Sequence, residues 1–284
     1  MKRNAYRGTS FNLPCNRKFW KKCGDFDSLI QFQECAYRAL MNDLSNKQKA
    51  DSALVLDNYM KLLSAQVHVN LGGFKLPDFQ NYMYAAYLVY PYANFDYFLN
   101  ELVEDLAQLG IKIKIKIQKT YYKKRCTKLC QVLKQLKSKG INVSIDSYKT
   151  EMFDFYRLRR NAVAHMLPVS TYISAFNKVQ KSKNQVLKTY PHQPSALQSA
   201  NQINFDDFIV CTANLKNIAD IIVRAIECHI NWKNIGKTHP KWIDYRGFNS
   251  IYLLDRDRRI GYIRSKVASL YGVQLTDEEC KCFF

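Results

Sequence analysis

Residues 78–110 of the chain, DFQNYMYAAYLVYPYANFDYFLNELVEDLAQLG, carry the pattern that decides the fold. After Pro91, apolar side chains recur three and four residues apart, which is the spacing of one face of an α-helix. Pro91 either kinks one helix or separates two, and Gly110 suits the end of the second. The stretch therefore predicts helices with one buried face, formed after Pro91 by Phe95, Phe98, Leu99, Leu102 and Leu106.

The segments on both sides of this stretch repeat the helical pattern. Upstream, the apolar spacing predicts helices at about residues 27–44 and 47–66. Downstream, it predicts helices at about residues 122–139, 147–167 and 206–232. Several amphipathic helices in one chain favour helix-on-helix packing. We therefore expect a mainly α protein built as an up-and-down helical bundle.

Two kinds of segment interrupt the helical pattern. The sequence IKIKIKI at residues 111–117 alternates apolar residues with lysine, and INVSI at 141–145 is short and apolar. Their spacing predicts two strands that pair as a small β-ribbon. Residues 169–203 contain no Asp or Glu and have the composition of a mobile basic connection. The expected bundle thus carries a ribbon and basic insertions.

The length of the chain sets its domain organisation. With 284 residues, of which 47% are hydrophobic, it can form one large domain with appendages. The aromatic and helical segments fall in its middle. We expect an N-terminal helical extension at residues 1–77, the bundle at 78–232 and a C-terminal extension at 233–284.

Charge is the most unusual property of the composition. Lys and Arg number 43 against 24 acidic residues, which gives a formal net charge of +19. A polyanion such as a phosphate backbone would offset this self-repulsion. Eleven cations and no acid occur between residues 112 and 139, with Tyr121 and Tyr122 among them, and rings beside cations suit single-stranded nucleic acid. The alternative is that these lysines are simply solvated along a helix. If the segment binds RNA, the predicted RNA-binding residues are Lys112, Lys114, Lys116, Lys119, Lys123, Lys124, Arg125 and Lys128.

Neither a membrane span nor a metal centre is expected. The uncharged residues 79–95 contain Gln, Asn, Pro and five tyrosines, which is typical of a buried helix. The N-terminal residues lack the apolar stretch of a signal peptide. The nine cysteines lack zinc-like spacing, and Cys126 and Cys130 are expected to be small core residues. We therefore expect reduced thiols, a cytoplasmic protein and no cofactor.

The candidate catalytic residues lie in LRRNAVAH, residues 158–165. On a helix, Asn161 and His165 share a face, whereas Arg160 lies about 140° round from His165. A histidine can transfer protons to and from the ribose 2′-hydroxyl and the leaving 5′-oxygen, and an arginine can stabilise the phosphate during RNA cleavage. The alternative is structural: Arg160 pairs with an acid such as Asp154, and His165 caps the helix end.

Arg160-Asn161-x-x-x-His165 resembles the Arg-x4-6-His motif of the HEPN superfamily, in the variant with Asn after the Arg. The resemblance implies an up-and-down bundle and a metal-independent endoribonuclease of the kind found in toxin, abortive-infection and RNA-processing systems. It implies Arg160, Asn161 and His165 as catalytic residues, with Asp96 and Arg159 in support, and a homodimer whose two protomers build one cleft. AMP-accepting members carry Tyr two residues after the His; Leu167 stands there, so that regulation is not expected.

The resulting hypothesis is an RNA-cleaving toxin or defence effector that acts without metal and is restrained by an antitoxin or regulatory protein. Two other functions stay open. The first is a non-catalytic RNA-binding module in which the same motif grips phosphate. The second is a protein-interaction subunit whose positive charge is neutralised by an acidic partner.

Overall fold

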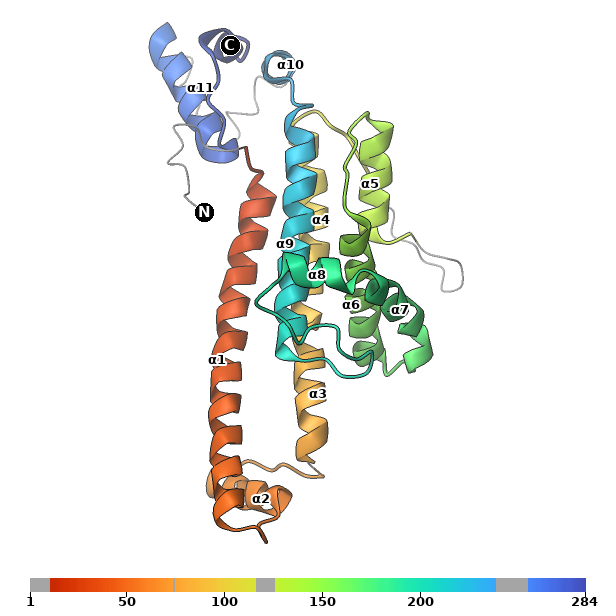
Figure 1. Ribbon diagram of the computed structural model, residues 1–284. Helices are drawn as coiled ribbons and strands as arrows, with labels where there is room; N and C mark the ends of the chain where they lie inside the picture. The colour runs from red at the N-terminus through yellow and green to blue at the C-terminus, as the bar shows by residue number, and fades with distance from the viewer. Residues whose placement is uncertain (1–10, 74, 116–125, 239–254) are drawn as a thin grey trace. The chain divides into compact units, whose positions relative to one another are not determined.

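The computed structural model describes residues 11–73, 75–115, 126–238 and 255–284. Within these residues the chain is mainly helical and contains no strand (Figure 1), which confirms the expected helical class. The helices are α1 (Pro14–Ala50), α2 (Leu56–Gln66), α3 (Leu76–Tyr87), α4 (Val89–Gln108), α5 (Lys128–Ser138), α6 (Ser147–His165), the 3-10 helix η1 (Val169–Thr171), α7 (Ile173–Lys181), α8 (Lys183–Thr189), α9 (Phe205–Glu227), α10 (Trp232–Thr238), α11 (Arg256–Tyr271) and α12 (Asp277–Lys281).

The helices form two compact units, and each unit is made from separate pieces of the chain. Three long helices, α1, α4 and α9, each begin in one unit and end in the other. The expected organisation into segments 1–77, 78–232 and 233–284 stays a prediction, because the compact units do not follow consecutive segments of the chain. Unit 1 comprises Met1–Trp20, Phe95–Ile145 and Asn217–Phe284, and unit 2 comprises Lys21–Asn94 and Asp146–Lys216.

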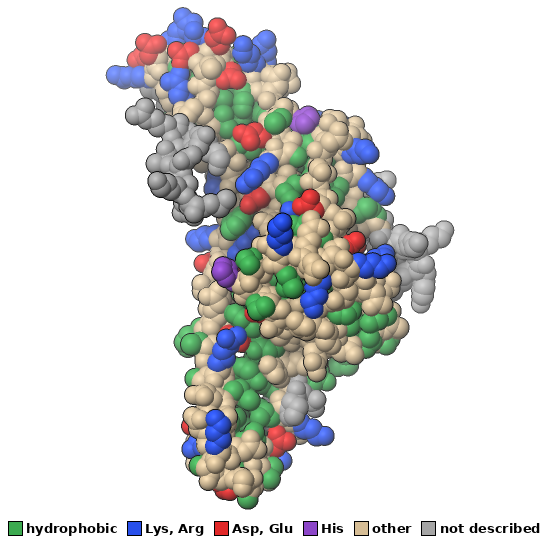
Figure 2. Space-filling model, in the orientation of Figure 1, with side chains coloured by type: hydrophobic (Ala, Val, Ile, Leu, Met, Phe, Trp, Pro, Cys, Tyr) green, Lys and Arg blue, Asp and Glu red, His purple; other side chains and the backbone are tan. Residues whose placement is uncertain are grey.

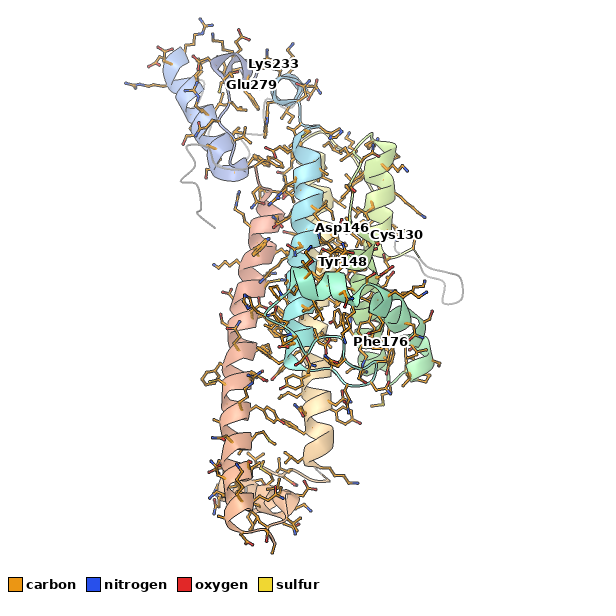
Figure 3. The ribbon with its side chains drawn as sticks, in the orientation of Figure 1. Cys130, Asp146, Tyr148, Phe176, Lys233 and Glu279 are labelled. Atoms are coloured by element: carbon orange, nitrogen blue, oxygen red, sulfur yellow. A yellow bond between two sulfur atoms is a disulfide. The ribbon has the colours of Figure 1, made fainter. Side chains whose placement is uncertain are left out.

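Aromatic side chains form much of the core of unit 2. Phe208 of α9 contacts Tyr87 of α3, with 5.8 Å between ring centroids, and Phe26 of α1 at 6.1 Å. Phe155 of α6 packs on Phe176 of α7 at 5.3 Å, which places α7 against α6 (Figures 1 and 3). Such contacts bury the apolar faces that the helical spacing predicts.

Unit 1 joins the start of α1 to the C-terminal helices. Phe19 of α1 contacts Phe98 of α4, with 5.2 Å between ring centroids. The backbone amide of Asn12 donates to the carbonyl of Tyr271 at 2.9 Å, and the Tyr271 ring lies 5.5 Å from that of Trp232 in α10. Residues far apart in the sequence therefore share one core.

The helix ends are fixed by side chains near them in sequence. Thr127 accepts from the amide of Cys130 at the start of α5, and Asp255 accepts from the amide of Arg258 at the start of α11. Thr276 forms a capping box for α12 with Glu279, which is labelled in Figure 3. These caps satisfy backbone donors that have no partner within the helix.

Two local expectations are not met in the described residues. Residues 111–115 and 141–145 form no strand, so the β-ribbon is not confirmed there, and residues 116–117 lie outside the described part. The side-chain amide of Gln135 on α5 bonds both the amide and the carbonyl of Lys114, which occupies backbone groups that a ribbon would use. Residues 169–203, expected as a mobile connection, instead contain η1, α7 and α8.

The expectation of reduced thiols is wrong for one pair of cysteines. A disulfide joins Cys126, two residues before the start of α5, to Cys130 within it. Their Cα atoms are 5.5 Å apart, a separation that suits a disulfide. The two residues therefore form a covalent loop around the cap residue Thr127 and are not simple core residues.

Candidate functional site

The candidate site lies at the C-terminal end of α6 in unit 2. The helix ends at His165, and Met166 adopts the left-handed conformation with φ of 50°. The amide of Leu167 donates to the carbonyl of Ala162 at 2.9 Å, so the chain turns sharply after His165. The imidazole of His165 is consequently exposed at the last turn of the helix.

Arg160 is half-buried and lies against an aromatic ring. Its guanidinium carbon is 5.7 Å from the centroid of Tyr92, a buried residue of α4. The hydroxyl of Tyr92 donates to the carbonyl of Phe153 at 2.6 Å, which fixes the ring. Burial raises the pKa of Tyr92 well above its ordinary value, so the phenol stays neutral. Tyr92, which the sequence pattern did not single out, therefore positions the cation by a cation–π contact.

Asn161 and His165 occupy the same face of α6, as their spacing predicts. Asn161 is half-buried and His165, one turn further along the helix, is exposed to solvent. Arg160 lies on a different face, about 140° from His165. A single chain thus presents the histidine and the arginine in different directions from one helix end.

Arg159, expected as a supporting residue, lies inside unit 2. Its side chain is buried, its Nη2 donates to the carbonyl of Asn201 at 2.8 Å, and its guanidinium lies 5.0 Å from the ring centroid of Tyr172. The hydroxyl of Tyr172 bonds the side chain of Asn201 at 3.2 Å. Arg159 therefore ties α6 to the segments that follow η1 and α8.

The structural alternative from the sequence named Asp154 as a partner for Arg160. Asp154 forms an ion pair with Arg157, three residues further along α6, at 3.4 Å, and its pairing with Arg160 stays a prediction. Asp154 and Arg157 are three residues apart, so they meet on the surface of the same helix.

The other predicted residues belong to unit 1. Asp96 lies on α4 and is half-buried, so its support of Arg160, a unit 2 residue, stays a prediction. Lys112 and Lys114 are exposed, and Lys128 is half-buried in the first turn of α5. Five of the predicted RNA-binding residues lie outside the described residues, namely Lys116, Lys119, Lys123, Lys124 and Arg125.

A buried carboxylate in unit 2 forms several hydrogen bonds to neighbouring segments. The side chain of Asp207 accepts from the hydroxyl of Tyr156 on α6 at 2.7 Å and from the amide of Leu197 at 2.9 Å. It also accepts from the amide of Asn204 at 3.1 Å, and the amide of Asp207 donates back to the side chain of Asn204 at 3.0 Å. Burial raises the pKa of Asp207 to about 6, and these hydrogen bonds oppose the rise. The sequence indicated only that Asp206 and Asp207 open a helix.

The chain that follows His165 is apolar and then basic. Four exposed apolar side chains follow His165, namely Met166, Leu167, Val169 and Ile173. Figure 2 shows hydrophobic side chains on the surface in the region of α7. The chain from residue 169 to 203 carries four lysines and no acid. This end of α6 therefore suits contact with both an apolar surface and a polyanion.

Neither a helix that could span a membrane nor a cluster of metal ligands occurs in the described residues. No described helix has both the length and the apolar composition needed to cross a membrane. In the same residues, no group of three or more His, Cys, Asp or Glu side chains lies close enough to hold a metal ion.

The candidate site is therefore defined by the geometry of α6 and its neighbours, and the resemblance to the HEPN superfamily stays a prediction. No protein-family model, curated protein or solved structure matches this chain.

Proposed function

We propose that this chain is a metal-independent endoribonuclease whose active residues are Arg160, Asn161 and His165. The observation that carries the proposal is the end of α6, where an exposed imidazole and an amide share one face and a guanidinium is fixed on the Tyr92 ring. The net charge of +19 supports a phosphate backbone as the substrate.

The three side chains supply the functions that cleavage by the ribose 2′-hydroxyl requires. His165 takes the proton from that hydroxyl or gives one to the leaving 5′-oxygen, since an imidazole transfers protons near neutral pH. Arg160 stabilises the charge that develops on the phosphate. Asn161 orients the phosphate or the imidazole through its amide. The 2′-oxygen bonds to phosphorus as the bond to the 5′-oxygen breaks, which leaves a 2′,3′-cyclic phosphate.

A second copy of the chain completes this site. Arg160 and His165 point to different sides of α6, so the arginine of one protomer and the histidine of the other fit one phosphate better than the pair from one helix. The exposed apolar side chains after His165, from Met166 to Ile173, provide an area that a partner copy would bury. We place the dimer interface there.

The test compares wild type with His165→Ala on mixed cellular RNA in EDTA. We expect the variant to lose about 100-fold or more of the cleavage rate, and the wild-type products to end in cyclic phosphate. His192→Ala is the matched control, because His192 is also exposed in unit 2 and lies outside the proposed site. Circular dichroism checks that both variants fold.

Two results would overturn the proposal. Equal cleavage by wild type and His165→Ala would remove His165 from the mechanism. RNA binding without cleavage by dimeric wild type would leave a binding module with the same surface. The proposal also includes a role as a toxin or defence effector that an antitoxin or regulatory protein restrains. These two parts of the proposal require that the protein cleaves RNA.

A further inference from the structure

A pocket of about 240 Å³ opens in unit 2, and its lining includes no residue of α6. Its volume is below the roughly 300–1,000 Å³ of pockets that take drug-sized ligands, so it suits a ligand of one or two fused rings. Its walls come from α1, α3, the first turn of α9 and the segment before α9. The side chains that matter for the argument are Glu34, Tyr37, Arg38, Tyr84, Phe205 and Asp206.

Aromatic rings form the apolar walls of the pocket. The rings of Tyr37 and Tyr84 meet edge to face, with 6.4 Å between centroids. The guanidinium of Arg38 on α1 lies 5.6 Å from the ring centroid of Phe205 at the start of α9. Flat rings and a flat guanidinium are the surfaces on which an unstacked nucleobase packs.

A buried carboxylate fixes this arrangement. Glu34 accepts from Nε of Arg38 at 2.6 Å and from the hydroxyl of Tyr84 at 2.8 Å. Glu34 is 5% exposed, so each of its oxygens is held by one wall of the pocket. The pocket is therefore preorganised by the protein itself, which lowers the entropic cost of binding a ligand.

The remaining polar atoms define what the ligand must offer. One carboxylate oxygen of Asp206 accepts from the amide of Ser195 at 2.9 Å, and for the other the described residues provide no hydrogen-bond partner. Nε of Arg38 donates to Glu34, but for the two Nη atoms of Arg38 the described residues provide no hydrogen-bond acceptor. The pocket thus has one free acceptor group and one free donor group. Because two carboxylates outweigh one guanidinium, a simple anion is disfavoured.

We propose that this pocket binds a single guanine base, supplied either by single-stranded RNA or by a free guanine nucleotide. Guanine matches the pocket because its N1 and N2 groups donate, as Asp206 requires, while its O6 and N7 accept, as Arg38 requires. Adenine lacks a second acceptor beside N7, and cytosine carries its donor and both acceptors on a single edge, whereas guanine offers two adjacent acceptors on one edge and two donors on another. The site does not use His165, so it goes beyond the proposed cleavage activity and does not depend on it.

The experiment is calorimetric titration of the full chain with 5′-GMP, 5′-AMP and 5′-CMP. We expect GMP to bind about tenfold or more tightly than CMP, the discrimination typical of one well-made pair of hydrogen bonds to a base. Asp206→Asn should abolish this preference, because its amide can still accept from Ser195 but turns a donor toward the base. Asp257→Asn is the control, since it removes an equal charge from an exposed position on α11.

Several outcomes decide the inference. Similar binding of GMP and CMP by wild type, an unchanged preference in Asp206→Asn, or tighter binding of the cation spermidine than of GMP would each overturn it. An oligonucleotide with one guanine, compared with a guanine-free one, separates RNA from free nucleotide as the source of the base. His165→Ala should keep the GMP preference, so loss of cleavage in that variant and loss of base recognition in Asp206→Asn test the two proposals separately.

Discussion

Replacing Asp207 by Asn should change how the stability of the protein depends on pH. Burial raises the pKa of Asp207 from its ordinary value of 3.8 to about 6 in the folded chain. The unfolded chain therefore releases this proton at lower pH than the folded chain does. The stability that Asp207 contributes is fully present below about pH 4 and is lost as the pH rises through about 6.

The size of the effect follows from the two pKa values. The difference between 3.8 and about 6, at about 1.4 kcal/mol for each pH unit, corresponds to about 3 kcal/mol in the free energy of unfolding. Asn cannot ionise but keeps a carbonyl oxygen that accepts from Tyr156 and Leu197. The variant should therefore lack this pH dependence, while Asp27 and Asp105, whose pKa values burial also raises, contribute equally to both proteins.

Urea unfolding of wild type and Asp207→Asn at about pH 4.5 and about pH 7 measures the effect. Relative to the variant, wild type should lose most of the expected 3 kcal/mol between the two pH values. Asp257→Asn, exposed on α11, should follow wild type. If the wild-type and Asp207→Asn free energies differ by the same amount at both pH values, Asp207 does not titrate in this range and the reasoning from burial fails.

Three further predictions concern the surfaces of the molecule. A triple variant in which Gln replaces Lys112, Lys114 and Lys128 should bind RNA with a weaker salt dependence. The slope of log affinity against log salt concentration should fall in magnitude by about 2, since each lost phosphate contact removes about 0.7. An unchanged slope in filter-binding measurements over a series of salt concentrations would exclude this surface as an RNA-binding site. Met166→Gly should raise the free energy of unfolding by about 1 kcal/mol, because glycine adopts a positive φ without strain, and thermal unfolding checks it. Leu167→Lys should convert a dimer to a folded monomer in sedimentation experiments, and a dimer that persists would place the interface elsewhere.

The helical class could be predicted from the sequence because apolar spacing is a local property. The face from Phe95 to Leu106 is buried as the pattern indicates, and Gly110 and Gly140 adopt the positive φ expected where a helix stops. Helix α1 begins at Pro14, well before the start predicted at about residue 27, because Gly24 does not interrupt it. No neighbouring group lies within 4 Å of the position that a side chain at Gly24 would take, and the helix continues through it.

The candidate site could be predicted only in part. The shared face of Asn161 and His165 follows from helical geometry alone. The contact between Arg160 and Tyr92, by contrast, joins α6 to α4 through two residues that are 68 positions apart in the sequence. No local sequence pattern indicates such a pairing. The same holds for Asp207, whose burial depends on Tyr156 and Leu197. Contacts of this kind are tertiary, so spacing along one helix does not reveal them.

The way in which unit 1 is assembled from distant segments has a consequence for synthesis. Both segments of unit 2 have been made once the ribosome reaches residue 216. In unit 1, in contrast, Asn12 lies between the buried residues Phe11 and Leu13, and its amide donates to the carbonyl of Tyr271 near the other end of the sequence. At about 5–20 residues per second, apolar side chains near the start of the chain wait on the order of tens of seconds for their partners. We expect the nascent chain to be bound by chaperones through this N-terminal segment, and its release to coincide with the emergence of α11.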